Sequence, residues 1–325
     1  MNPTHFQILQ VCFPPAGATR WCVPARFRTG GRDYVRRLAL GLALLLRATS
    51  APGVTNEIQY LSGTDKDHTV LWDFRVSAGR NAGVWTNIPV PSCWDTKGFG
   101  SYEYGNDITS EYGEYRHSFT VPNSWTNKRV FLVYEGSMTD TETKLNGNAP
   151  GVLPATPALT NERAFNNSAT ASAGQTGGLA ASTAGNGSSG IALHQGSFYE
   201  FSYEVTSNLL FGTSNLLEVT VHKKSANTSI NKAEREADYW TFGGIFRPVY
   251  LEARPPEFIE RIATDAKADG QITVQAFCSD LTNNYTVAAR VTDTNGVPLG
   301  GEFTAPISSG AASVTLSATL PLPQP

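Results

Sequence analysis

The sequence predicts an all-β protein, and three observations lead to this prediction. Of the 325 residues, 10% are aromatic and only 16% are charged, and the chain contains 30 Gly and 19 Pro. This composition favours many short strands joined by turns over long surface helices. From Thr69 onward, apolar residues alternate or run in strand-length pieces, a spacing that indicates β-sandwiches. No amphipathic helical stripe of useful length competes with these strands.

The N-terminal 54 residues differ from the rest of the chain in charge. They carry seven Arg and one acid. Arg32, Arg36 and Arg37 lie shortly before the apolar run 38–46, and small residues 48–51 follow it. This order is that of a signal peptide, so we predict that residues 1–54 are a signal peptide with an upstream extension. We therefore expect a secreted or periplasmic protein. Because a helix needs ~20 apolar residues to cross a bilayer, we expect no membrane span.

Residues 55–325 carry 18 basic and 27 acidic residues, a net charge of −9. Binding to phosphate backbones depends on clustered Lys and Arg, so this balance argues against a nucleic-acid partner. Cys93 and Cys278 are the two cysteines of this part, and they form no metal-ligand pattern. We expect two separate thiols rather than a disulfide, and no metal site.

The first sandwich is expected at residues 55–256. Its predicted strands are 70–76, 113–121, 129–134, 141–145, 197–205 and 216–222, and Asn146-Gly147 is typical of a hairpin turn. Residues 154–193 consist largely of Ala, Gly, Ser, Thr and Asn. Such a low-complexity insertion buries too little apolar surface to offset its ordering entropy, so we expect a weakly held loop.

A second set of short strands follows Pro255-Pro256. The predicted strands are 258–263, 271–279, 285–292 and 312–318, with a turn at Asn295-Gly296. The last residues, Leu320-Pro321-Leu322-Pro323-Gln324-Pro325, come where one or two closing strands would still be expected. The second domain, residues 257–325, is therefore predicted to be truncated.

One stretch is more specific than the strand pattern. Residues 233–251, AEREADYWTFGGIFRPVYL, combine acids, an aromatic pair, a Gly-Gly turn and a strand-like run. The stretch closely resembles the signature of glycoside hydrolase family 2, and the blocks 115–122, 145–147 and 194–199 are similar to the same family in the same order. The resemblance covers roughly residues 85–260. It implies a jelly-roll (galactose-binding-like) β-sandwich followed by an incomplete immunoglobulin-like β-sandwich.

The resemblance implies the N-terminal portion of a retaining β-glycosidase, similar to β-galactosidase, that acts on a β-galactoside-like glycan. Retaining enzymes need two carboxyl groups about 5–5.5 Å apart. In this family both belong to a (β/α)₈ barrel, which takes ~250 residues. Two Asn-Glu pairs occur in the chain. The pair at Glu57 borders the leader and the pair at Glu162 lies in the insertion, so we reject both as the acid/base motif. We expect no catalytic residue here, an inactive chain on its own, and the missing catalytic barrel as its partner.

Three residues are predicted to contact sugar. The resemblance implies that Asp238 reaches the active site from the sandwich and, only in a complete enzyme, helps to hold a sodium ion; the alternative is a structural loop acid. Trp240 stacks on a sugar ring or packs under its own loop. Asn106 points toward the sugar or occupies an ordinary turn. Glu234 and Glu236 are expected to pair with Arg235, Lys232 or Arg247 on a solvated loop.

Two other functions stay open. One is a stand-alone carbohydrate-binding or adhesion module, for which an exposed aromatic strip would be the sign. The other is a non-functional gene fragment, which would give an unstable product.

Overall fold

The computed structural model describes residues 7–13, 21–23, 56–102, 110–150, 192–236, 240–293 and 296–320. For 7–13 and 21–23 only the backbone is described. The chain divides into two compact units, one made of residues 57–254 and the other of residues 1–56 together with 255–325. Both are built from β-strands, which confirms the predicted all-β class. The described residues include no helix that is long and apolar enough to cross a membrane.

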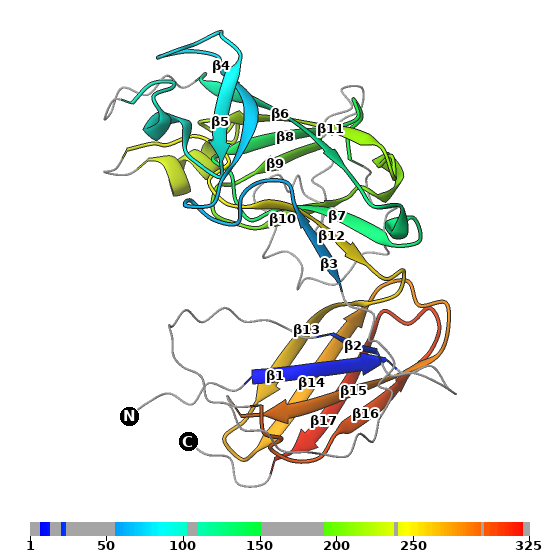
Figure 1. The fold of residues 1–325 in the computed structure, drawn as a ribbon. Coiled ribbons are helices and arrows are strands. Elements are labelled where there is room, and N and C mark those ends of the chain that lie inside the picture. Colours follow the sequence, from blue (N-terminus) through cyan, green and yellow to red (C-terminus); the bar gives the residue numbers. More distant parts are fainter. Residues whose placement is uncertain are drawn as a thin grey trace, which may run out of the picture. The chain divides into compact units, whose positions relative to one another are not determined.

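The first unit is a sandwich of two antiparallel sheets (Figure 1). Its six-stranded sheet has the order β5-β4-β6-β11-β8-β9, and its four-stranded sheet has the order β10-β7-β12-β3. The strands are β3 (Glu57–Tyr60), β4 (Val70–Val76), β5 (Thr86–Val90), β6 (Tyr112–Thr120), β7 (Arg129–Tyr134), β8 (Asp140–Leu145), β9 (Ala192–Gln195), β10 (Phe201–Glu204), β11 (Ser214–His222) and β12 (Val249–Arg254). The short helical turns are η1 (Trp94–Lys97), η2 (Asn123–Trp125), η4 (Thr206–Asn208), α1 (Thr228–Ile230) and η5 (Asn231–Arg235).

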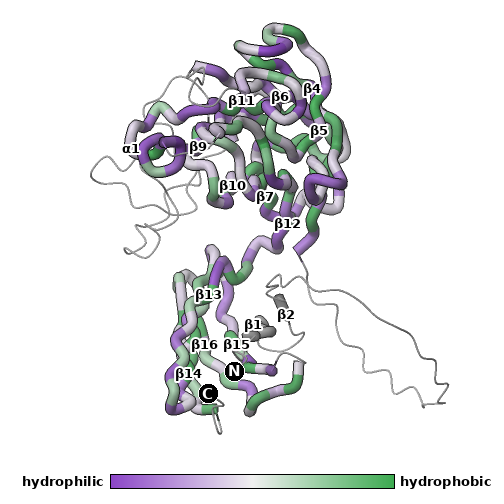
Figure 2. Tube along the Cα trace, turned by 90° about the vertical axis from the view of Figure 1, so that its left-hand side faces the viewer, coloured by the Kyte–Doolittle hydropathy of each residue, from purple (hydrophilic) through white to green (hydrophobic). Residues whose placement is uncertain are grey.

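The alternation of buried and exposed residues explains how the two sheets of this sandwich pack against each other. Buried and more exposed positions alternate along β11, so one face of the strand joins the core and the other faces outward. Figure 2 shows that the strands of this unit carry both hydrophobic and hydrophilic residues, coloured green and purple. One continuous core lies between the sheets and includes Trp72, Phe74, Leu132 and Tyr134, each at most 1% exposed. Burying such side chains contributes ~1.5–3 kcal/mol each.

The second unit contains two further antiparallel sheets, with the orders β13-β14-β17 and β16-β15-β1-β2. The strands are β1 (Gln7–Phe13), β2 (Trp21–Val23), β13 (Ile259–Ala266), β14 (Gln271–Cys278), β15 (Tyr285–Thr292), β16 (Phe303–Ile307) and β17 (Ser313–Thr319). Its core includes Val274, Val287 and Leu316. Strand β1 pairs with β15 and β2 pairs with β1. That residues 1–54 are removed as a leader stays a prediction. Such removal would also remove strands β1 and β2 from the second unit.

The structure corrects two local predictions. The expected strand 197–205 is shorter: the chain bends at residues 197–199, directly after Gly196 with its φ of +123°, and β10 covers only Phe201–Glu204. The end of the expected loop 154–193 belongs to strand β9, which pairs with β8 from Ala192 onward. Residues 154–191 lie outside the described part. Cys93 and Cys278 are both free thiols, as predicted, and lie in different units.

Candidate functional site

Two loops meet at the end of the first sandwich where β4 and β11 end and β6 begins. We call residues 93–102 and 240–248 the loop edge. The Trp94 N–H donates to the Gly243 carbonyl at 3.0 Å, and the Ser92 N–H donates to the Ile245 carbonyl at 2.8 Å. Gly243 is required here, since a Cβ at this position would lie 2.2 Å from Cζ2 of Trp94. The Gly-Gly sequence therefore lets the second loop pass directly over the Trp94 indole.

A cluster of buried charges lies beneath the loop edge. Lys223 Nζ is 2.6 Å from Asp95 Oδ1 and 3.5 Å from Glu111 Oε1, and all three side chains have no exposed surface. Lys223 also donates to the Ser101 carbonyl at 2.6 Å. Lys223 follows β11, Asp95 lies in η1 and Glu111 precedes β6. We call Lys223, Asp95 and Glu111 the buried ion cluster.

The carboxylates of the buried ion cluster hold the loops through further hydrogen bonds. Asp95 Oδ2 accepts from the Gly243 N–H at 2.7 Å. Glu111 accepts from Trp94 Nε1 and from the Ser101 N–H, both at 2.7 Å. Burial raises the pKa of Asp95 above its ordinary value, and the hydrogen bond from Lys223 opposes this rise. The cluster thus ties both halves of the loop edge to β6 and β11.

An aromatic surface lies on the loop edge. Tyr102 and Trp240 are each 46% exposed, and their ring centroids are 6.3 Å apart. Phe242 stacks on Tyr102 at 5.9 Å, and the guanidinium group of Arg80 lies 5.7 Å from the Tyr102 ring centroid. Arg80 in turn donates to the Asp95 carbonyl at 2.8 Å. These contacts hold the Tyr102 ring while leaving almost half of its surface open to solvent.

Of the three predicted sugar contacts, the structure describes Trp240 only. Asn106 and Asp238 lie outside the described residues, in segments 103–109 and 237–239. Tyr102 directly precedes the first segment and Trp240 directly follows the second, and the rings of these two residues lie side by side. The structure thus brings together the described ends of the two loops that carry the predicted contacts. The described residues also contain no group of three or more His, Cys, Asp and Glu side chains fit for a metal ion.

The prediction of a solvated loop around the acids is wrong for Arg235. This side chain is 4% exposed, donates to the Phe242 carbonyl and contacts the Met138 sulfur at 3.5 Å. Glu234 accepts from the Ser197 N–H at 2.8 Å. Arg247 donates to the carbonyls of Glu135 and Phe198. These residues support the backbone beneath the aromatic surface.

Sequence reasoning missed the buried ion cluster, although one signal was present. Four alternate residues of β11 face the core, and the same period places Lys223 inward as well. The four are Asn215, Leu217, Val219 and Val221. A lysine in that phase needs buried acids as partners, because an isolated ammonium is too costly to bury. Which acids supply the partners depended on the fold and not on any local pattern.

The fold of this two-sandwich β-protein is similar to that of the N-terminal parts of family 2 β-glycosidases of known structure. A putative β-galactosidase from Bacteroides fragilis matches with a TM-score of 0.54 and 18% identity, over 82% of this chain and 35% of that chain. A Bacteroides uniformis β-glucuronidase matches with a TM-score of 0.53 and 20% identity, over 81% of this chain and 28% of that chain. A family 2 glycosyl hydrolase from Bacteroides cellulosilyticus DSM 14838 matches with a TM-score of 0.52 and 15% identity, over 81% and 32%.

These similarities establish the fold, and the chain spans about a third of the length of the solved structures it matches. No protein-family model and no curated protein sequence matches the chain.

Proposed function

We propose that this chain is the sugar-contacting N-terminal portion of an exported, β-galactosidase-like retaining β-glycosidase of glycoside hydrolase family 2. The loop edge forms one wall of the active site, and a (β/α)₈ barrel outside these 325 residues supplies the catalytic carboxyl groups. The exposed Tyr102–Trp240 pair carries this proposal, because a buried ion cluster holds the loops from which it projects.

The division of labour follows from the chemistry of retention. One carboxylic acid protonates the leaving oxygen, and the other carboxylate forms a glycosyl-enzyme that water then hydrolyses. Asp95 and Glu111 are fully buried beside Lys223, so neither reaches a sugar. Glu57 is bound by Trp125 at 2.6 Å and by Lys128, so it is not free for acid–base work. In our proposal Asp238 accepts hydrogen bonds from sugar hydroxyls, Asn106 lies near them, and Trp240 covers an apolar ring face.

The proposal is tested in two stages. The purified chain, assayed on 4-nitrophenyl β-galactoside and β-glucuronide, should show no turnover. Activity that stays with the chain through orthogonal purification would overturn the assignment of catalysis to a separate barrel. The reading frame after the Pro325 codon should encode that barrel. In the completed protein, Asp238→Asn should lower kcat/KM, whereas Leu71→Ala, at a site 65% exposed on β4, should not.

A specific observation also favours a stand-alone carbohydrate-binding module. Phe198 and Tyr199 are 44% and 53% exposed, and Phe198 contacts Phe246 of the loop edge at a ring distance of 6.3 Å. They add exposed aromatic rings next to Phe246 of the loop edge, besides those of Tyr102 and Trp240. A stop codon directly after Pro325, with a folded chain that binds polysaccharide, would favour this function. An unfolded product would instead favour a non-functional fragment.

A further inference from the structure

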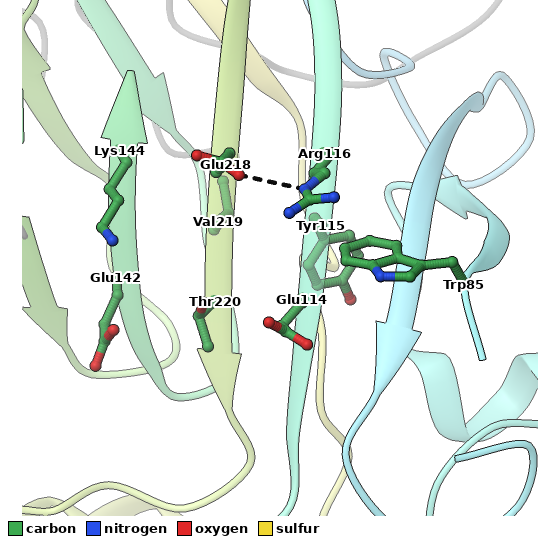
Figure 3. Close-up of a pocket in the computed structure, with 9 residues that line it drawn as sticks. All are labelled: Trp85, Glu114, Tyr115, Arg116, Glu142, Lys144, Glu218, Val219 and Thr220. Atoms are coloured by element: carbon green, nitrogen blue, oxygen red, sulfur yellow. Dashed lines mark hydrogen bonds and ion pairs between the residues drawn. The ribbon is translucent and has the colours of Figure 1, made fainter. Parts of the chain in front are cut away.

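A second feature of the first sandwich lies away from the loop edge, on the outer face of the six-stranded sheet. A groove of about 130 Å³ is lined there by Trp85, Glu114, Arg116, Glu142, Lys144 and Glu218 (Figure 3). The polar side chains come from β6, β8 and β11, and Trp85 directly precedes β5. The groove lies over the middle of the strands, since Glu218 is the fifth of the nine residues of β11.

The charges on this face follow the strand register. Asp73, Arg116, Glu218 and Lys144 occupy paired positions on four adjacent strands, so negative and positive side chains alternate across the sheet. Arg116 Nε donates to Glu218 Oε1 at 3.2 Å. In the next row, Arg75 Nε donates to Glu114 Oε2 at 2.6 Å. Cross-strand pairs of this kind stabilise a sheet and by themselves imply no ligand.

Trp85 adds a partly exposed aromatic ring to these charges. It is 37% exposed, although its ring lies against two cations: Cζ of Arg116 is 4.4 Å and Cζ of Arg75 is 5.0 Å from the ring centroid. Both arginines are themselves held by the carboxylates of Glu218 and Glu114. The indole is therefore a fixed apolar surface beside fixed polar groups. Such preorganisation lowers the entropy cost of binding.

The chemistry of the groove selects among ligands. Its lining acids and bases nearly balance, so neither an anion nor a cation gains a strong Coulomb attraction. Carboxylates accept and guanidinium and ammonium groups donate, and the hydroxyl groups of a sugar can do both in return. The volume is about ten times the ~10–15 Å³ needed for one water, which suits one small ring rather than a long segment. We infer that this groove binds a neutral sugar unit of a glycan, with the ring against Trp85 and its hydroxyls on the charge row.

This site goes beyond the proposed function, because it needs neither the loop edge nor a catalytic barrel. The test uses the full chain and three probes: cellotetraose, β-1,4-galactotetraose and tetragalacturonate. The indole N–H signals in ¹H–¹⁵N spectra report the two places separately. The signal of Trp85 is assigned by Trp85→Phe and that of Trp240 by Trp240→Phe.

A neutral tetrasaccharide should shift the Trp85 signal saturably at millimolar concentrations. Trp85→Ala, which lacks this signal and is measured by isothermal titration calorimetry against the parent, should weaken the binding about tenfold, equivalent to ~1.4 kcal/mol. Glu218→Gln, which keeps the indole, should weaken it severalfold, and Leu71→Ala on the same face should leave it unchanged. Thermal melts of each variant establish that the sandwich is folded.

Three results would overturn the inference: no saturable shift of the Trp85 signal with either neutral probe, tighter binding of tetragalacturonate, or unchanged affinity in folded Trp85→Ala and Glu218→Gln. A shift of the Trp240 signal alone would support the loop edge and refute the groove. A shift of the Trp85 signal alone would support the groove and count against sugar contact at the loop edge.

Discussion

The two sandwiches are stabilised by different kinds of interior. The described part of the first buries five charged side chains, Asp95, Glu111, Asp140, Lys223 and Arg235, and exposes aromatic rings above the buried ion cluster. Among the described residues of the second, the buried polar side chains are Ser279 and Thr292, and neither is charged. The difference shows which part of the molecule needs directional polar contacts. Apolar burial suffices to hold a sandwich together, whereas the first unit also fixes two long loops in one arrangement.

A buried ion cluster is weak evidence for stability, because desolvation offsets most of the Coulomb attraction. Its hydrogen bonds nevertheless have direction. Asp95 binds the Gly243 N–H, and Glu111 binds Trp94 and Ser101, so an alternative loop arrangement would leave buried polar groups unsatisfied. We hypothesise that the cluster specifies the loop edge rather than strengthens the fold.

The largest expected effect comes from Lys223→Met. Removing the ammonium leaves Asp95 and Glu111 buried without their cation, which should cost ~3–5 kcal/mol of unfolding free energy in urea titrations. The matched control is Lys66→Met, at a side chain 83% exposed, which should change stability by less than ~0.5 kcal/mol. A loss below ~1 kcal/mol at Lys223 would show that water reaches the cluster, and the comparison between the two interiors would fail.

A second variant examines the apolar interior. Leu316 is 2% exposed in the core of the second sandwich, so Leu316→Ala should cost about 3 kcal/mol through lost burial and a cavity. Amide hydrogen exchange in β14 and β17 should accelerate about a hundredfold, while exchange in β7 of the first sandwich stays unchanged. Equal acceleration in all three strands would mean that the two units unfold as one.

How far the sequence predicts this molecule depends on whether the information is local. Strand β15 coincides with the predicted range 285–292, because its residues fit the strand pattern without help from the fold. Strand β16 was missed, since Phe303–Ile307 is short, contains Pro306 and gains its place by pairing with β15. The contacts of Lys223 span 112 and 128 residues to Glu111 and Asp95, and no local pattern encodes such partners.

Acid should affect the first sandwich through His194. This ring is buried, stacks on Phe201 at 3.7 Å, and burial lowers its pKa from 6.5 to about 4. The unfolded chain therefore binds the proton more readily than the folded chain, and stability falls as the pH drops from about 6.5 toward about 4. The loss should reach ~2–3 kcal/mol.

The control for this prediction is His194→Phe, which keeps a stacked ring and cannot titrate. Urea titrations at pH 7 and pH 4 should show a larger loss of stability in the parent than in this variant, because the other acid-sensitive groups are common to both. Equal losses in the two proteins would mean that His194 is protonated in the fold.

The smallest expected effect on stability is also the most informative about the loop edge. Trp240 is 46% exposed, so Trp240→Ala should change the unfolding free energy by less than ~0.5 kcal/mol.

The two interpretations of Trp240, as a sugar contact or as a ring packed under its loop, predict different results for this variant. A ring that covers a sugar should weaken the binding of methyl β-galactoside about tenfold, or ~1.4 kcal/mol, when it is removed, and Trp240→Phe should recover part of that loss. A ring that packs beneath its own loop should instead cost more than ~1.5 kcal/mol of stability, as buried aromatic side chains do. Trp94→Phe provides the contrast, because Trp94 is fully buried and its Nε1 donates to Glu111. This change should lower stability by removing one of the hydrogen bonds to a buried carboxylate, which keeps its bonds from Ser101. Calorimetry and urea titration on these three variants therefore decide whether Trp240, two residues after Asp238, belongs to the binding surface or to the interior.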